Sequence, residues 1–197
     1  MLIVITSHTK GFVRERGKDD LDVKLAPNLL TKQIDGYFDT NGILQYNSFL
    51  KRIIYTYYYR NQYVVATPSL LPEPTGKTID TVSIARIKVA YSEGDKIGKL
   101  ASPPYIVNKG VSTFGKYLFI NAAMTGRFEP VAMWKRASVV DVYNLIDYSY
   151  VFSFYLPDKS EKKVSQFKVD DNRVIVICGK YLQVYQLQTD YYERIKL

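Results

Sequence analysis

Short apolar runs alternate with clusters of glycine, proline, asparagine and aspartate along most of the chain. Within residues 82–91 apolar and polar side chains alternate with a period of two, because Ile87, Val89 and Tyr91 fall on one side and two cations on the other. A period of two is typical of a half-buried strand, and no window longer than about ten residues shows the 3.6-residue period of a capped helix. The pattern therefore predicts an all-β protein with little helix.

The predicted strands are joined by short turns, and two groups of them are expected to form hairpins. Residues 50–59 and 63–67 are predicted to pair across the turn Arg60-Asn61. Near the end of the chain, a three-stranded antiparallel meander is predicted over residues 164–169, 173–178 and 181–187. The other predicted strands are residues 2–6, 42–46, 82–91, 116–121, 138–145, 148–156 and 191–196.

One unit recurs three times along the chain: an apolar strand, a turn and a second strand. Its anchors are Ile53, Leu118 and Val174, which lie 65 and 56 residues apart. Blades of β-propellers repeat at about 40–50 residues, so these units would carry longer loops. We therefore predict antiparallel meander blades of a β-propeller, about four blades or a partial propeller, in a single domain of residues 1–197. A β-sandwich is the alternative, because it would give the same set of strands.

The chain resembles the six-bladed β-propellers of the TolB-like and NHL-like kind, in particular a group of uncharacterised bacterial envelope proteins. The resemblance is carried by residues 50–63, 76–81, 137–145 and 150–156, within a region of residues 34–190. It implies a location in the cell envelope or periplasm, although the chain as given does not begin with a basic start and the ~7–15 apolar residues of an export signal. Because these motifs are patterns of strands, the resemblance implies a fold and no catalytic residue.

Six blades require roughly 240–300 residues, whereas this chain has 197. The chain is therefore expected to be the C-terminal portion of a longer propeller or an open array of blades. An open array leaves strand edges that can pair with another chain. We accordingly predict an exposed edge near residues 2–6, or a homo-oligomer or partner chain that pairs with an edge strand.

The net charge of +8 is spread evenly along the chain. Residues 1–100 carry 14 basic and 10 acidic side chains and residues 101–197 carry 13 and 9, so each part has a charge of +4. Proteins that bind nucleic acids usually concentrate their basic residues on one face, so no nucleic-acid partner is predicted. No apolar run approaches the ~20 residues that span a membrane.

Side chains suited to catalysis or metal binding are scarce. The chain has one histidine, His8, and one cysteine, Cys178, which stands in an apolar run and is expected in the core. A Ser-His-Asp triad needs a histidine base and a zinc site needs several ligands, so no triad, metal or cofactor is predicted. Two carboxylates are enough for glycan hydrolysis, and Asp80, Asp141 and Glu129 are the formal candidates. The alternative function is therefore a carboxylate-dependent glycan hydrolase or lyase.

Tyrosine is unusually frequent, with 18 copies. Residues 57–63 place tyrosines on both sides of a predicted hairpin, and Trp134 stands beside two cations. Tyr, Trp and Arg are frequent anchors of binding surfaces. The leading prediction is a non-enzymatic binding or scaffolding module that recognises a protein, peptide or glycan on an aromatic face. The predicted binding residues are Tyr57, Tyr59, Arg60, Trp134 and Arg136. The other interpretation is that these aromatic side chains pack neighbouring blades together.

Overall fold

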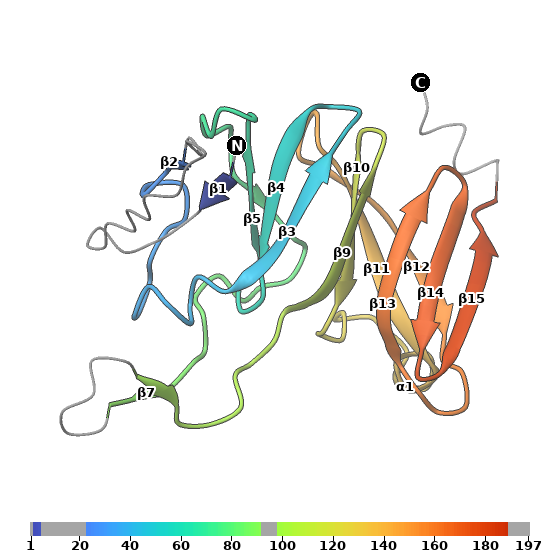
Figure 1. Cartoon of the computed structure of the whole chain (residues 1–197). Helices are drawn as coiled ribbons and strands as arrows, with labels where there is room; N and C mark the ends of the chain where they lie inside the picture. The colour runs from blue at the N-terminus through green and yellow to red at the C-terminus, as the bar shows by residue number, and fades with distance from the viewer. Residues whose placement is uncertain (1, 5–22, 92–97, 189–197) are drawn as a thin grey trace.

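The computed structural model describes residues 2–4, 23–91 and 98–188 (Figure 1). Several predictions lie outside the described residues: His8, the loop of residues 17–22, the turn of residues 92–96, the strand of residues 191–196, and residues 5 and 6 of the first predicted strand. Apart from one short helix, every regular element of the described part is a strand, which confirms the all-β prediction.

Three antiparallel sheets follow one another along the chain, and each is a meander in which neighbouring strands are consecutive in sequence. The first sheet contains β3 (Gly42–Asn47), β4 (Arg52–Tyr57), β5 (Gln62–Ala66) and β6 (Gly76–Lys77). The second sheet contains β9 (Asn108–Phe114), β10 (Tyr117–Ala122), β11 (Ala137–Asn144) and β12 (Tyr150–Pro157). The third sheet contains β13 (Val164–Asp170), β14 (Arg173–Cys178) and β15 (Tyr181–Gln186), as the predicted meander requires.

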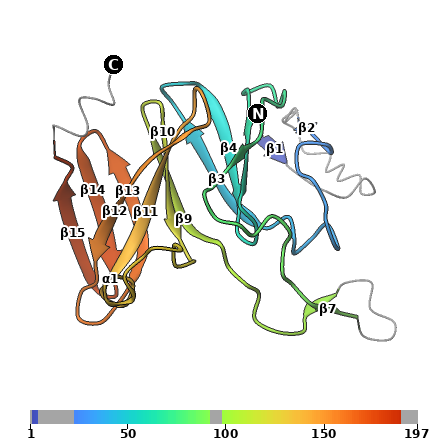
Figure 2. The same cartoon turned by 180° about the vertical axis from the view of Figure 1, so that it is seen from behind.

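The first strands of the three sheets lie next to one another. The central strand β9 contacts β3 on one side and β13 on the other. Figures 1 and 2 show the sheets side by side, fanning out from this line. Radial repetition of meander sheets around their first strands is the arrangement of propeller blades, whereas a sandwich consists of only two packed sheets. The described residues thus form three blades of a partial propeller.

The predicted repeat is confirmed at its anchors. Ile53, Leu118 and Val174 each occupy the second position of the second strand in their sheet, and all three are buried. The long spacings arise from residues 78–107, which connect the first and second sheets, and from residues 123–136, which connect β10 to β11 within the second sheet. The connection between the first and second sheets carries β7 (Val89–Ala90) and β8 (Lys99–Leu100), which pair only with each other among the described residues.

Two apolar cores fill the spaces between the sheets. The core between the first and second sheets contains Ile54, Tyr63, Val65, Val111, Leu118, Ile120, Tyr143 and Leu145. The core between the second and third sheets contains Tyr117, Phe119, Val140, Val142, Leu156, Val164, Val169, Val174, Val176 and Cys178. The middle sheet serves both cores because successive side chains on a strand point to opposite faces. The expectation that Cys178 is a core residue is therefore confirmed.

Three small elements complete the described structure. β1 (Leu2–Val4) pairs in parallel with β2 (Val23–Leu25), so this part of the expected N-terminal edge has a partner within the chain, and a homo-oligomer through it stays a prediction. The helix α1 (Val131–Arg136) precedes β11 and buries none of its side chains. No helix in the described part of the chain is long and apolar enough to cross a membrane.

The strand predicted for residues 82–91 is wrong over most of its length, because only Val89–Ala90 pairs with another strand. The segment before it crosses the end of the first sheet instead. There the Asn61 N–H donates to the Val82 carbonyl at 2.7 Å, and the Ala85 N–H donates to Gln33 Oε1 at 2.9 Å. These single hydrogen bonds replace the ladder that a neighbouring strand would provide, so the alternation of side chains did not produce a strand.

Candidate functional site

The first hairpin turns of the three sheets meet at one end of the array, along the upper edge in Figure 1. The turns are residues 48–51, 115–116 and 171–172. Together with the adjoining strand ends they line a groove of ≈ 760 Å³, formed by residues 46–49, 113–117 and 168–171. We call it the hub groove. All three sheets contribute to it, which follows from the placement of their first strands side by side.

Asn47 fixes the first turn to the second sheet. Its Nδ2 donates to Thr113 Oγ1 at 2.6 Å and to the Gly115 carbonyl at 2.9 Å, and its Oδ1 accepts the Leu50 N–H at 2.8 Å. Both ends of this buried amide are therefore hydrogen-bonded. Thr113 Oγ1 in turn donates to the Tyr117 carbonyl at 2.8 Å. Two walls of the hub groove are thus held in one hydrogen-bonded network.

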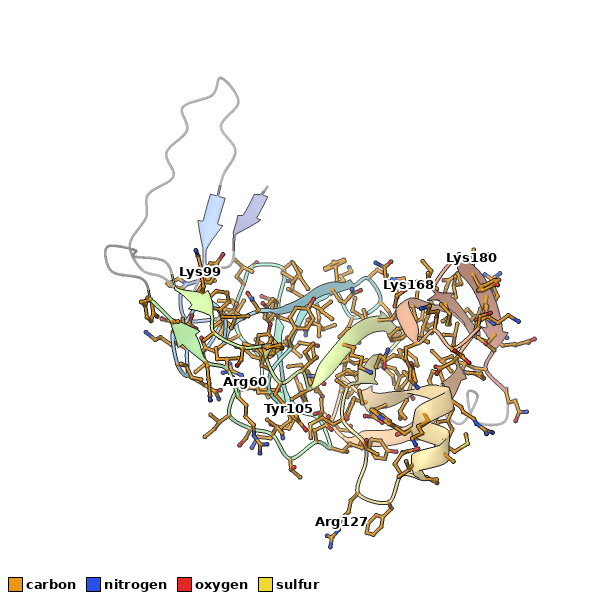
Figure 3. All side chains as sticks on the ribbon, turned by 90° about the horizontal axis from the view of Figure 1, so that it is seen from below. Arg60, Lys99, Tyr105, Arg127, Lys168 and Lys180 are labelled. Carbon is orange, nitrogen blue, oxygen red and sulfur yellow. The ribbon has the colours of Figure 1, made fainter. Side chains whose placement is uncertain are left out.

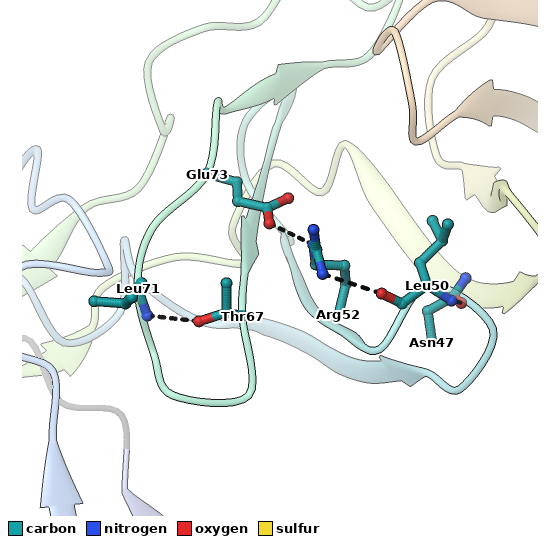
Figure 4. Close-up of polar contacts among 6 residues, drawn as sticks. All are labelled: Asn47, Leu50, Arg52, Thr67, Leu71 and Glu73. Atoms are coloured by element: carbon teal, nitrogen blue, oxygen red, sulfur yellow. Dashed lines mark hydrogen bonds and ion pairs between the residues drawn. The ribbon is translucent and has the colours of Figure 1, made fainter.

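Arg52 supports the same turn from the other side (Figure 4). Its Nη1 donates to the Leu50 carbonyl at 3.1 Å, and its Nε forms an ion pair with Glu73. The hydrogen bond that Arg52 donates to Glu73 raises the pKa of Arg52. The Leu71 N–H donates to Thr67 Oγ1 at 3.1 Å in the loop that carries Glu73. The backbone next to Phe49 is therefore held on both sides.

The third sheet is attached through the opposite face of β9. The Val169 N–H donates to Ser112 Oγ at 2.9 Å, and Ser112 is fully buried. Ser112 and Thr113 are consecutive on β9, so their side chains point to opposite faces of the sheet. One of them binds β13 and the other binds the end of β3. The floor of the hub groove is consequently tied to both neighbouring sheets.

Aromatic rings dominate the hub groove. Phe49 is 72% exposed and Tyr46 is 56% exposed, whereas Phe114 is half-buried and Tyr117 is buried. Burial raises the pKa of Tyr117 to about 12, so its hydroxyl group stays protonated. Lys116 Nζ lies 5.7 Å from the centroid of the Tyr117 ring, and the third sheet adds one lysine and two aspartates. Apolar walls with a few charged groups suit an apolar side chain of a ligand.

Three of the predicted binding residues are buried at the opposite end of the array. Tyr57 and Arg60 are 0% exposed, and Tyr59 is 8% exposed. The Arg60 guanidinium lies 3.6 Å from the centroid of the Tyr57 ring, and its Nη2 donates to the Thr31 carbonyl at 2.8 Å. The side chains of Tyr57 and Arg60 attach residues 29–31 to the first sheet. They do not form the exposed aromatic face that the sequence suggested, which corrects that interpretation.

The other two predicted residues lie on α1. Figure 3 looks at this end and shows Arg60 on the side of the first sheet, with α1 on the side of the other two sheets. Trp134 is half-buried, with Lys109 Nζ 5.3 Å from the centroid of its ring, and Arg136 is exposed. Asn108, which precedes Lys109 in the sequence, is buried, and its side chain donates to the carbonyls of Tyr57 and Arg60 at 2.7 and 3.0 Å. A ligand role for Trp134 and Arg136 stays a prediction.

Two of the three candidate carboxylates, Asp80 and Glu129, act through their charges on the third, Asp141. Asp141 on β11 is 3% exposed and accepts a hydrogen bond from Ser153 Oγ. Burial raises the pKa of Asp141 to about 6. The hydrogen bond from Ser153 lowers this pKa, whereas the negative charges of Asp80 and Glu129 raise it further. Burial also raises the pKa of Asp80. None of the three lines the hub groove, and among the described residues no cluster of His, Cys, Asp and Glu could hold a metal ion.

Sequence reasoning missed the hub groove because it missed β9. Residues 108–114 read Asn-Lys-Gly-Val-Ser-Thr-Phe, which is polar, contains a glycine and lacks a clear period of two. The repeat itself contained a usable signal. The turn that precedes each anchor lies at the same end of its sheet, so the three turns could have been expected to lie together. Phe49 stands in the first of these turns and is an exposed aromatic residue.

Comparison with known proteins leaves the family open. No family model and no curated protein matches the sequence. Hsv2 from Kluyveromyces lactis is similar with a TM-score of 0.42 and 7% identity over 75% of this chain and 33% of that chain. Hsv2 from Kluyveromyces marxianus has a TM-score of 0.42 and 8% identity over 77% and 35% of the two chains. The WD40 domain of Neurospora crassa Pan2 has a TM-score of 0.27 and 9% identity over 70% and 59%.

The chain thus spans about a third of the length of the two Hsv2 chains. Likeness at these TM-scores carries no conclusion about ligand or activity. The partial-propeller assignment depends on the order and contacts of the strands themselves. The TolB-like and NHL-like resemblance, with the bacterial envelope location it implies, stays a prediction.

Proposed function

We propose that the protein is a non-enzymatic binding module that holds an extended peptide segment of a partner protein in the hub groove. The observation that carries this proposal is the exposure of Phe49, a residue that is 72% exposed and lines a groove to which three sheets contribute. A large apolar side chain gains about 1.5–3 kcal/mol when it is buried, so a bound segment that covers Phe49 is favoured. The hydrogen bonds of Asn47 hold the turn in place, which lowers the entropic cost of binding.

A peptide fits the groove better than a glycan does. The rings of Phe49 and Phe114 have no polar group, and Val169 lies beside them in the lining. Two lysines and two aspartates of the lining give no net charge. An apolar side chain of a peptide can occupy such walls, while its backbone finds partners among the charged groups of the rim. The volume of ≈ 760 Å³ also lies within the range of about 300–1,000 Å³ that is usual for ligand sites.

The test uses the whole chain as bait for a displayed library of random linear peptides. A selected peptide is then synthesised, and its affinity is measured for the unchanged protein, for Phe49→Ala and for Phe128→Ala. Phe128 is the matched control because it is 90% exposed and lies outside the groove. We expect Phe49→Ala to weaken binding by about tenfold or more, as is usual for an aromatic anchor, and Phe128→Ala to leave it unchanged.

Three results would overturn the proposal. One is a library that yields no peptide. Another is a peptide whose affinity depends on Phe128 and not on Phe49. The third is a glycan array in which a glycan, rather than any peptide, binds with a strength that depends on Phe49, because the ligand would then belong to another class.

A carboxylate-dependent glycan hydrolase or lyase is the second candidate, and the raised pKa of Asp141 favours it. A carboxyl group that stays protonated near pH 6 can serve as a general acid. Incubation of the protein with a panel of polysaccharides, followed by an assay for new reducing ends and unsaturated products, tests this candidate. Activity that disappears in Asp141→Asn would support it, whereas an inactive unchanged protein would contradict it.

A further inference from the structure

The third sheet has three strands among the described residues, although the first and second sheets each have four. β15 is therefore an edge strand in the position where the other two sheets continue. In the second sheet the corresponding place is filled by the long strand β12. A fourth strand of the third sheet would lie beside β15 and would face β12 across the space between the sheets.

A second groove marks this place. It measures ≈ 420 Å³ and is lined by residues 152–156 of β12, by Val174, and by residues 185–188 at the end of β15. We call it the edge groove. Phe152, Phe154 and Leu156 face it from the second sheet and belong to, or pack against, the core between the sheets. The edge groove is thus an apolar extension of that core, at the position of the absent strand.

The backbone of β15 presents hydrogen-bonding groups to this place. The Leu187 N–H donates to the Asn172 carbonyl at 2.7 Å, so residue 187 points its backbone groups towards β14. Alternation along an antiparallel pair then directs the backbone groups of residues 181, 183 and 185 towards β14 as well. The N–H and C=O groups of Leu182, Val184 and Gln186 consequently point outwards, where the structure places no strand among the described residues.

This edge lacks the usual protection. β15 reads Tyr-Leu-Gln-Val-Tyr-Gln, without a charged residue or a proline, and Leu182 and Val184 are 70% and 60% exposed. Edge strands commonly carry lysine or proline, or are very short, which prevents pairing with other chains. The edge of the first sheet follows that rule, because β6 has two residues and ends in Lys77.

We propose that β15 binds an extended segment of a partner protein as a fourth strand, with alternate apolar side chains of that segment in the edge groove. Main-chain hydrogen bonds give affinity in this mode, and pockets for alternate side chains give specificity. Lys159 Nζ and Lys180 Nζ lie 5.9 and 5.6 Å from the centroid of the Tyr181 ring, at the start of β15. A strand antiparallel to β15 ends there, so the segment carries an acidic residue or a terminal carboxylate at its C-terminal end.

The probe is a synthetic peptide of alternating valine and threonine that ends in two glutamates. Its affinity is measured for the unchanged chain, for Val184→Pro and for Val184→Thr. Proline removes the outward N–H of residue 184 and leaves the ladder to β14 intact, whereas threonine keeps the N–H and changes only the exposed side chain. We expect Val184→Pro to weaken binding by about tenfold or more and Val184→Thr to change it by less than about twofold.

Two peptide controls keep the test valid if Val184→Pro does not fold. N-methylation of alternate residues removes the donors of the peptide and should abolish binding to the unchanged chain. Moving the glutamates to the N-terminal end should weaken binding, because they then lie away from Lys159 and Lys180. Equal binding of the N-methylated peptide, or unchanged affinity in a folded Val184→Pro variant, would overturn the proposal.

Binding of the probe to a shortened chain that ends at Gln188 shows which segment occupies the place beside β15. If the probe binds this shortened chain and not the full chain, residues 189–197 occupy the site and the partner strand is rejected. Failure to bind either chain rejects the site altogether. Phe49→Ala should leave binding of this probe unchanged, so the outcome is independent of the hub groove.

Discussion

The side-chain amide of Asn47 donates a hydrogen bond of 2.6 Å to Thr113 Oγ1, and this bond joins the end of β3 to β9 across two sheets. Asn47→Ala removes it together with the bonds to Gly115 and Leu50. We expect the free energy of unfolding to fall by about 2–3 kcal/mol, because three hydrogen bonds are lost, one of them buried and two partly buried. Urea unfolding measures this change.

Asn144→Ala is the matched control for Asn47→Ala. Asn144 also stands at a hairpin turn, where it bonds the Ile146 N–H and Asp147, but it joins no two sheets. Its replacement should cost about 1 kcal/mol or less and should not affect peptide binding. Equal losses of stability in the two variants would contradict the proposed role of Asn47.

Asp141 predicts a pH dependence of stability. Its pKa is raised by burial from 3.8 to about 6 in the folded protein, so its contribution to stability is fully present below about pH 4 and is lost as the pH rises through 6. The shift corresponds to about 3 kcal/mol. Asp141→Asn, which cannot ionise, should become more stable than the unchanged protein as the pH rises from 4 to 7.5, as measured by urea unfolding.

Asp147 is expected to give a pH dependence of stability opposite in sign to that of Asp141. Hydrogen bonds from Ser149 lower the pKa of this exposed carboxylate, so its contribution is present at neutral pH and is lost as the pH falls. The stability advantage of the unchanged protein over Asp147→Asn should therefore shrink as the pH falls, whereas Asp141→Asn should gain stability over the unchanged protein as the pH rises. The same slope for both variants would exclude burial as the cause at Asp141.

Arg60 is expected to tolerate loss of its charge better than loss of its volume. Its side chain is fully buried on the Tyr57 ring, and its Nε and Nη1 have no hydrogen-bond partner in the described part of the chain. Arg60→Met keeps the packing and removes the desolvated charge, so thermal unfolding should show little loss or a gain of stability. Arg60→Ala leaves a cavity and should cost about 2–4 kcal/mol. A larger loss in the methionine variant would contradict this account.

Gly76 and Gly115 are predicted to respond to alanine for different reasons. A Cβ at Gly76 would collide with the ring of Tyr63, which is fully buried and cannot move aside. A Cβ at Gly115 would meet no atom within 4 Å, but the φ angle of 55° there disfavours a side chain. Denaturant unfolding should show a loss of about 2–3 kcal/mol for Gly76→Ala and about 1 kcal/mol for Gly115→Ala. The reverse order would be inconsistent with the close packing of Gly76.

The parts of the fold that the sequence predicts are those in which local pattern and burial agree. Ile53, Leu118 and Val174 begin apolar runs bounded by turn residues, and each run is a second strand with neighbours on both sides. Ile54 of β4, Leu118 of β10 and Val174 of β14 lie in the cores between the sheets, which requires apolar residues in these strands. The hairpin of β4 and β5 and the meander of the third sheet were therefore predictable.

Burial of the predicted binding residues depends on contacts that are distant in sequence. Arg60 stands in a polar turn between two tyrosine-rich runs, which suggests an exposed position. It is covered because residues 29–31 cross that end of the first sheet and bind Arg60 and Tyr57 through Thr31. β9 was missed for a related reason, since its strand depends on pairing with β10, and its polar side chains are satisfied by hydrogen bonds to the two other sheets.

An amide NMR titration of the protein with a peptide selected on it tests the central claim most directly. If the hub groove is the binding site, the largest shifts fall on residues 46–49, 113–117 and 168–171, which come from three separate sheets. The shifts of α1 and of the turn after β4 should then remain small. Shifts concentrated on Trp134, Arg136 and their neighbours, with the three hub turns unchanged, would contradict the account.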